Sequence, residues 1–163
     1  MQDHADWMAL ALREAEKAFH KGEVPIGAVV IHEGRIVGRG HNMMETLQDP
    51  TAHAEMLAIT SAANTLASWR LDGCVLYVTL EPCIMCTGAI LLSRIPTIVF
   101  GAQDPRYGAC GSAVQLAENE RIDVRTNVIR GVAEAECSEL IKRFFQQVRR
   151  EKTDRRDAGR SGQ

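Results

Sequence analysis

Two short groups of residues in the sequence combine side chains that bind metal ions with one that can move protons. The first is His53-Ala54-Glu55, and the second is Pro82-Cys83-Ile84-Met85-Cys86. Each lies where a helix is expected to begin, and Cys83 and Cys86, three residues apart, project from one helix face. One imidazole and two thiolates would leave the fourth tetrahedral position of a zinc ion open for water. That arrangement is typical of a catalytic zinc site and not of a closed structural one.

Glu55 is the expected proton carrier beside this metal site. Two thiolates and a neutral imidazole cancel the charge of Zn²⁺, so a bound water is acidified less than it would be by three imidazoles. A neighbouring carboxylate can accept the proton of that water and return it to a substrate. We therefore predict that His53, Cys83 and Cys86 are metal ligands and that Glu55 is the catalytic residue. Taken singly, the Cys-x-x-Cys pair could hold a structural metal, and Glu55 could be a solvated helix residue.

Composition favours one domain in a reducing compartment. The chain has 163 residues, of which 45% are hydrophobic, and a formal net charge of -2. The five cysteines, an odd number, fit metal binding better than a disulfide framework. Cys74 and Cys137 are interpreted as core residues, whereas Cys110 could either face the site or pack beneath it. No secretory signal or membrane-spanning segment is recognised, so a cytoplasmic location without membrane attachment is expected.

Strand and helix patterns alternate along the chain. Helices are predicted from Asp3 to Gly22 and over 52–66, 83–93 and 133–150, and strands over 24–31, 35–40, 75–80, 97–100 and 124–129. Glu33-Gly34 is expected to turn the first hairpin. This order predicts an α/β fold of three layers, with a mixed central sheet of about five strands flanked by helices. Residues 1–150 are expected to form a single domain, and the charged residues 151–163 a disordered tail.

The last predicted helix carries a basic and aromatic cluster. From Lys142 to Arg160 there are eight Lys or Arg residues against three Asp or Glu residues. Phe144, Phe145 and Arg149 are candidate substrate-binding residues, because such a helix could hold RNA through phosphate contacts and stacking. The alternative is one core phenylalanine and a solvated basic face.

The combination His-x-Glu and Pro-Cys-x-x-Cys is the signature of zinc deaminases that act on nucleobases. With these motifs, the sequence resembles the bacterial tRNA-specific adenosine deaminases within the wider cytidine and deoxycytidylate deaminase family. The likeness covers most of residues 5–150, including Trp7-Met8, 23–29, 49–55, 76–83 and 93–95. Phe100-Gly101-Ala102, the glycine-rich residues 108–112 and Phe144-Phe145 are similar to the tRNA branch in particular.

The resemblance implies a cytidine deaminase-like fold and hydrolytic conversion of adenosine to inosine at the wobble position of a tRNA anticodon loop. It implies one zinc ion per subunit, attack of an activated water on carbon 6, and a base splayed out of the loop into a pocket. Glu55 would protonate the ring nitrogen and then the departing amine. A homodimer is implied as well.

The resemblance also implies substrate-binding roles for Asn42 and Asp104. Both have a simpler interpretation as turn residues. Met43-Met44-Glu45 departs from the more basic or proline-containing stretch of the family. Two other functions stay open: a deaminase of a free base or nucleoside such as guanine or cytidine, and a nucleic-acid-binding subunit with structural zinc. Iron or cobalt could also occupy such ligands in vitro.

Overall fold

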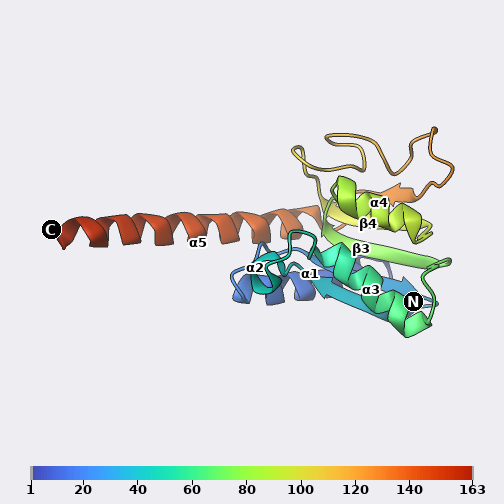
Figure 1. Ribbon diagram of the computed structural model, residues 1–163, viewed down its shortest axis with the longest axis horizontal. Helices are drawn as coiled ribbons and strands as arrows, with labels where there is room; N and C mark the ends of the chain where they lie inside the picture. The colour runs from blue at the N-terminus through green and yellow to red at the C-terminus, as the bar shows by residue number, and fades with distance from the viewer. Residues whose placement is uncertain (1, 163) are drawn as a thin grey trace.

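A five-stranded mixed sheet forms the centre of the protein, described for residues 2–162 in a computed structural model (Figure 1). The strands are β1 (Gly27–His32), β2 (Arg35–His41), β3 (Cys74–Leu80), β4 (Thr97–Ala102) and β5 (Asn127–Ile129). They lie in the order β2-β1-β3-β4-β5. β1 is antiparallel to both β2 and β3, whereas β3, β4 and β5 run parallel to one another. The predicted mixed sheet is confirmed.

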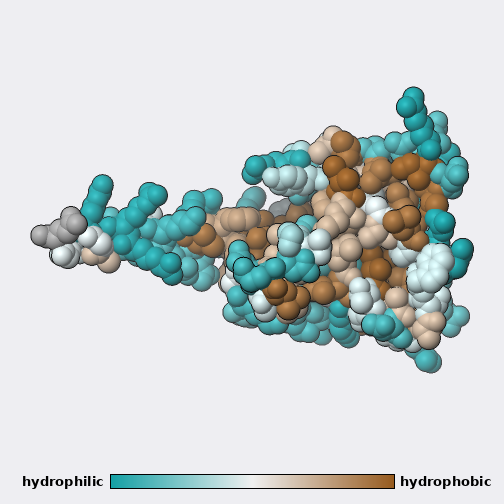
Figure 2. Space-filling view, in the orientation of Figure 1, coloured by the Kyte–Doolittle hydropathy of each residue, from teal (hydrophilic) through white to brown (hydrophobic). Residues whose placement is uncertain are grey.

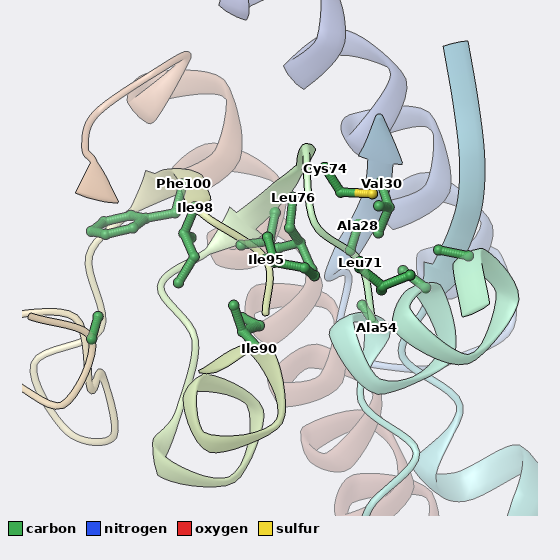
Figure 3. Close-up of a cluster of buried hydrophobic side chains, with 14 of the residues drawn as sticks. Ala28, Val30, Ala54, Leu71, Cys74, Leu76, Ile90, Ile95, Ile98 and Phe100 are labelled. Carbon is green, nitrogen blue, oxygen red and sulfur yellow. The ribbon is translucent and has the colours of Figure 1, made fainter. Parts of the chain in front are cut away.

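Helices cover both faces of this sheet. They are α1 (His4–His20), α2 (Met44–Leu47), α3 (Ala54–Leu66), α4 (Ile84–Leu92) and α5 (Glu134–Ser161). Alternate residues of the strands point to opposite faces. On one face Leu76 and Ile98 pack with side chains of α3 and α4, as Figure 3 shows for much of this cluster. On the other face Tyr77 and Val99 pack with α1 and with Cys137 of α5. The predicted three layers are therefore present.

The β1–β2 hairpin turns as the sequence predicts. Glu33 and Gly34 have φ values of 48° and 71°, and a two-residue turn with two positive φ angles matches the twist of the strands that it joins. β1 begins at Gly27 and not at Val24, where the sequence pattern places its start. The reason is Pro25, which has no N–H to donate to a strand partner, and the Ile26 amide, which donates to the Val24 carbonyl at 2.8 Å.

Two glycines of β2 allow α3 to lie close against the sheet. A Cβ atom at Gly38 would clash with the Ala58 carbonyl oxygen, and one at Gly40 would clash with the Ala54 carbonyl oxygen. Both clashes are with backbone atoms, which cannot rotate away. Because Ala54 is the first residue of α3, the contact at Gly40 also sets the position of the neighbouring His53 and Glu55.

α5 differs from its predicted form. The sequence predicts a helix that ends near Arg150 and a disordered tail after it, but the helix continues to Ser161 and extends away from the sheet (Figure 1). Residues 151–162 are all exposed. This segment has no proline and contains four Lys or Arg residues, which have good helix propensity, so it can prolong a helix already begun on the sheet. None of the helices within residues 2–162 has the length and apolar character needed to cross a membrane.

We predict that Gly40→Ala lowers the free energy of unfolding by about 2 kcal/mol, because the added methyl group overpacks the contact between β2 and α3. Gly88→Ala in α4 is the control, since a Cβ there meets no atom within 4 Å. That change should stabilise the helix by about 0.5 kcal/mol. Urea denaturation measures both, and equal stabilities of the two variants would contradict the packing argument.

Candidate active site

The four residues predicted to do chemistry meet where α3 and α4 begin. His53 and Cys83 are the residues that precede α3 and α4, both with extended backbone and without a side-chain capping bond to their own helix. Figure 1 shows that both helices begin at the end of the sheet from which α5 extends. The His53 Nδ1 atom lies 3.7 Å from Cys83 Sγ and 3.5 Å from Cys86 Sγ. The fold thus brings together two motifs whose His53 and Cys83 are 30 positions apart in the sequence.

The three side chains form a group suited to a metal ion. Their ligand atoms all lie within 4.8 Å of one another. Zinc with a bond of about 2.1 Å to nitrogen and about 2.3 Å to sulfur would, in tetrahedral geometry, place these two ligands about 3.6 Å apart. The separations of 3.5 and 3.7 Å agree with that value. A nitrogen and two sulfurs are also the donor types that zinc accepts, so the residues fit the ion.

Glu55 lies against this group and is almost entirely buried. Its side chain is 4% exposed, and Cys86 Sγ donates to its Oε2 atom at 3.4 Å. Burial raises the pKa of the Glu55 carboxyl to about 6, because a charged carboxylate is poorly solvated there. A carboxyl group with a pKa in this range can both accept and return a proton near neutral pH.

The two cysteines share a proton unequally. The hydrogen bond from Cys86 lowers the pKa of the Cys83 thiol to about 4, because it stabilises the thiolate. The same hydrogen bond, together with burial, raises the pKa of Cys86. The hydrogen bond with Cys83 raises the pKa of His53 above its usual value. Metal binding requires thiolates and a neutral imidazole, so a bound cation would displace the protons that these three groups otherwise hold.

The candidate metal group opens onto a cavity of about 710 Å³, a size typical of small-molecule sites. Its wall includes His53, Glu55 and Cys83, together with Asn42, Asp104 and residues of α5. Asn42 is 5% exposed, and its Oδ1 atom has no hydrogen-bond partner. A buried acceptor of this kind is costly unless a ligand supplies the donor.

Glu81 organises the loop that forms one wall of the cavity. This carboxylate is 2% exposed and accepts from the amides of Asp104, Cys110 and Ser112 at 3.3, 3.1 and 3.1 Å. The Ser112 hydroxyl donates to it as well. A Cβ atom at Gly108 would collide with the same carboxylate, so glycine is required there. Glu81 therefore holds both ends of the loop over residues 104–112.

Glu23 likewise holds a second segment of the cavity wall through hydrogen bonds to main-chain amides. It is 1% exposed and accepts from the amides of Glu45 and Thr46 at 3.0 and 2.7 Å, and from the Thr46 hydroxyl at 2.7 Å. Burial by itself would raise the pKa of Glu23, but these hydrogen bonds lower it below the usual value. The bonds hold the start of α2, whose Met44 lines the cavity. Sequence reasoning missed the roles of both Glu23 and Glu81. For Glu81 a signal was present, because it is a single charged residue between an apolar strand and Pro82.

The structure separates the predicted substrate-binding residues into two groups. Asn42, Asp104 and Phe145 line the cavity. Asp104 also serves as a turn residue, since its Oδ1 atom accepts from the amides of Arg106 and Tyr107 at 3.0 and 3.2 Å. Phe144 is instead buried against Phe19 of α1, with ring centroids 5.9 Å apart. It is the core phenylalanine of the pair because successive helix residues point about 100° apart.

The remaining predictions concern Arg149 and the other cysteines. Arg149 is exposed on α5 and lies outside the cavity wall. Cys74 and Cys137 belong to the two core clusters, which confirms their interpretation. Cys110 also packs in the core, with its sulfur 3.6 Å from the Thr87 hydroxyl, and burial raises its thiol pKa to about 11. It lies beneath the site and is not a member of the metal group.

A three-layer fold that groups one His, one Glu and two Cys side chains beside one cavity defines the class of hydrolytic nucleobase deaminases. The chain matches the MafB19-like deaminase family over residues 2–149. It is 49% identical to the tRNA-specific adenosine deaminase of Bacillus subtilis (strain 168), over 90% of this chain and 91% of the relative. The chain belongs to the MafB19-like deaminase family and, within it, to the group of the tRNA-specific adenosine deaminases.

Two solved structures are similar to this fold. One, from studies of A-to-I editing by tRNA:A34 deaminases at the wobble position of transfer RNA, has a TM-score of 0.79 and 45% identity. The match covers 82% of this chain and 97% of the chain in that structure. The other, a guanine deaminase from Bacillus subtilis, has a TM-score of 0.60 and 38% identity, and covers 63% of this chain and 66% of that chain. The predicted cytidine deaminase-like fold is confirmed.

We predict that Glu81→Gln lowers the free energy of unfolding by about 2 kcal/mol and raises KM more than it lowers kcat. The amide group of glutamine would face main-chain N–H donors and leave some of them without an acceptor. Glu120→Gln, an exposed change on a neighbouring segment, is the control. Urea denaturation and steady-state kinetics check both variants, and a Glu81 variant that behaves like the control would refute the role in holding the loop.

Proposed function

We propose that the protein hydrolytically deaminates adenosine to inosine at the wobble position of a tRNA anticodon loop, using one zinc ion held by His53, Cys83 and Cys86. The observation that carries this proposal is the group of three ligand atoms within 4.8 Å, beside the buried Glu55 and open to a cavity. The chain's 49% identity to a relative named for this activity supports the choice of substrate.

The reaction adds water across the double bond between carbon 6 and the adjacent ring nitrogen, and then breaks the bond between carbon 6 and its amino nitrogen. When bound, zinc acidifies a water molecule and so supplies the nucleophile at neutral pH. Glu55 accepts the proton of this water and delivers it to the ring nitrogen. It then takes the remaining proton from the new hydroxyl group on carbon 6 and carries it to the amino group, so that the C–N bond breaks, ammonia leaves and the oxygen stays on carbon 6 as a carbonyl. Glu55 suits this work because it is buried beside the ligands and contacts Cys86.

The cavity wall supplies contacts for a nucleoside turned out of the RNA loop. We assign Asn42 to accept a hydrogen bond from the nucleoside, since its Oδ1 atom is buried without a partner. Phe145, 43% exposed at the cavity wall, can stack on a base or on a neighbouring nucleotide. Asp104 shapes the loop beside the cavity, and we assign the exposed Arg149 to a phosphate contact.

We also propose that residues 1–150 form a single deaminase domain that works as a homodimer in the cytoplasm, where its tRNA substrate would be found. The family match over residues 2–149 supports the domain limits. The acidic body and the basic α5 suit a protein that meets RNA on one side only.

A second candidate is deamination of a small substrate such as guanine, which the 38% identity to a guanine deaminase structure favours. The decisive experiment incubates the zinc-loaded protein with an anticodon stem-loop that contains a wobble adenosine, and separately with adenosine, guanine and cytidine. Inosine should form only in the stem-loop, as detected by nuclease digestion and mass spectrometry. Turnover restricted to the free base or nucleoside would reject the tRNA proposal.

We predict that Glu55→Ala keeps its zinc content but lowers kcat by at least about 100-fold, because proton transfer is lost while the ligands remain. Cys83→Ala should lose both zinc and activity. Elemental analysis and the inosine assay measure the two effects. Near-normal turnover in the Glu55 variant, with zinc bound, would disprove its role as proton carrier.

A further inference from the structure

One face of α5 carries a continuous line of five cations and one phenylalanine. Its members follow one another at intervals of three or four residues and therefore share a face of the helix. This basic stripe consists of Lys142, Phe145, Arg149, Lys152, Arg156 and Arg160. The helix rises 1.5 Å per residue, so the stripe is about 27 Å long.

The basic stripe starts inside the candidate active site and ends far from the sheet. Lys142 and Phe145 line the cavity, whereas every later member is exposed. The distal half lies on the part of α5 that projects from the body in Figure 1, and Figure 2 shows that the surface there is largely hydrophilic. The stripe is thus a track that leads outward from the cavity.

The charge of the basic stripe is not compensated by the rest of the described chain. Within residues 2–162, none of its cations takes part in an ion pair. Of the acids of the distal helix, Glu151 and Asp154 point away from the stripe at about 100° per residue, whereas Asp157, three residues before Arg160, lies at its edge. One side of the projecting helix is therefore positive along its length.

The distal helix contributes nothing to the core. Residues 151–162 are exposed, and the family match ends at residue 149. Lys152, Arg156 and Arg160 thus lie outside the residues that the family model matches. Burial of apolar surface cannot explain why these three cations share one face of the helix, because the helix is exposed there. An anion outside the chain is the remaining physical reason for their alignment.

We propose that the basic stripe binds the phosphate backbone of the helical RNA stem that adjoins the loop whose base enters the cavity. The inference rests on the proposed function, since that function places an RNA loop at the cavity. Phosphates of a stem form a regular array of negative charge, and cations along a straight helix can neutralise several of them whatever the sequence. The stripe would hold the stem in line with α5 and direct the loop toward Glu55.

The test compares two double variants of the full-length protein. Arg156→Gln/Arg160→Gln removes two cations from the basic stripe, and Arg150→Gln/Arg155→Gln removes two cations from other faces of the same helix. Both change the net charge equally, and arginine and glutamine have similar helix propensities. Circular dichroism verifies that the helical content is retained in each.

The probes are two synthetic RNAs with the same wobble-adenosine loop. One has a stem of only a few base pairs, and the other has a stem at least as long as the stripe. We expect the stripe variant to bind the long-stem RNA about tenfold more weakly, with the slope of log Kd against log salt concentration reduced by about 2. Its affinity for the short-stem RNA should stay as in the unaltered protein. The control variant should keep most of its affinity for both RNAs.

Two results would overturn the stem contact. One is equal weakening by the two double variants, which would mean attraction to overall charge only. The other is a shift in sedimentation coefficient of the stripe variant without a change in RNA affinity, which would assign the stripe to a second copy of the chain. Inosine formation in the short-stem RNA by the unaltered protein is read separately. If no inosine forms while binding of the long-stem RNA still depends on the basic stripe, the proposed reaction is wrong and the proposed contact with the RNA stem is supported.

Discussion

The approach of one imidazole to two sulfurs is the contact on which the rest of the structure depends. His53 Nδ1 lies 3.5 and 3.7 Å from Cys86 and Cys83, and this requires the first turns of α3 and α4 to meet beside the same end of the sheet. The parallel pairing of β3 and β4 places α4 there, while the small residues of β2 let α3 lie close enough. A shift of about 1 Å in either helix would separate the ligands of a metal ion.

Buried carboxylates then build the cavity around this centre. Glu23 and Glu81 are nearly without solvent contact, yet each accepts hydrogen bonds from main-chain amides of the wall that it supports. Such charges are costly to bury and are tolerated because donors surround them. The walls are therefore rigid loops with satisfied polar groups. Asn42 is the exception, since its side-chain oxygen is left for a ligand.

α5 connects the core, the cavity and the solvent. Its first turns pack on the sheet through Cys137 and Leu140, and Phe144 meets Phe19 of α1. The adjacent Phe145 turns to the cavity, and the distal turns carry only exposed residues. One straight element thus gives the site a fixed relation to a charged surface well outside it. For a substrate as large as an RNA stem-loop, that relation provides orientation as well as affinity.

The sequence by itself determined the candidate group of His53, Glu55, Cys83 and Cys86, the hairpin at Glu33-Gly34 and the order of the strands and longer helices, because each depends on residue type and local spacing. Only the tertiary structure decided which of Phe144 and Phe145 is core, that Glu23 and Glu81 hold the walls, and that Asn42 keeps an unpaired oxygen. Those properties depend on what lies across the fold, which local spacing does not contain. The length of α5 could not be predicted from hydrophobic periodicity, because its exposed turns have none. They continue a helix that is already stabilised by packing on the sheet.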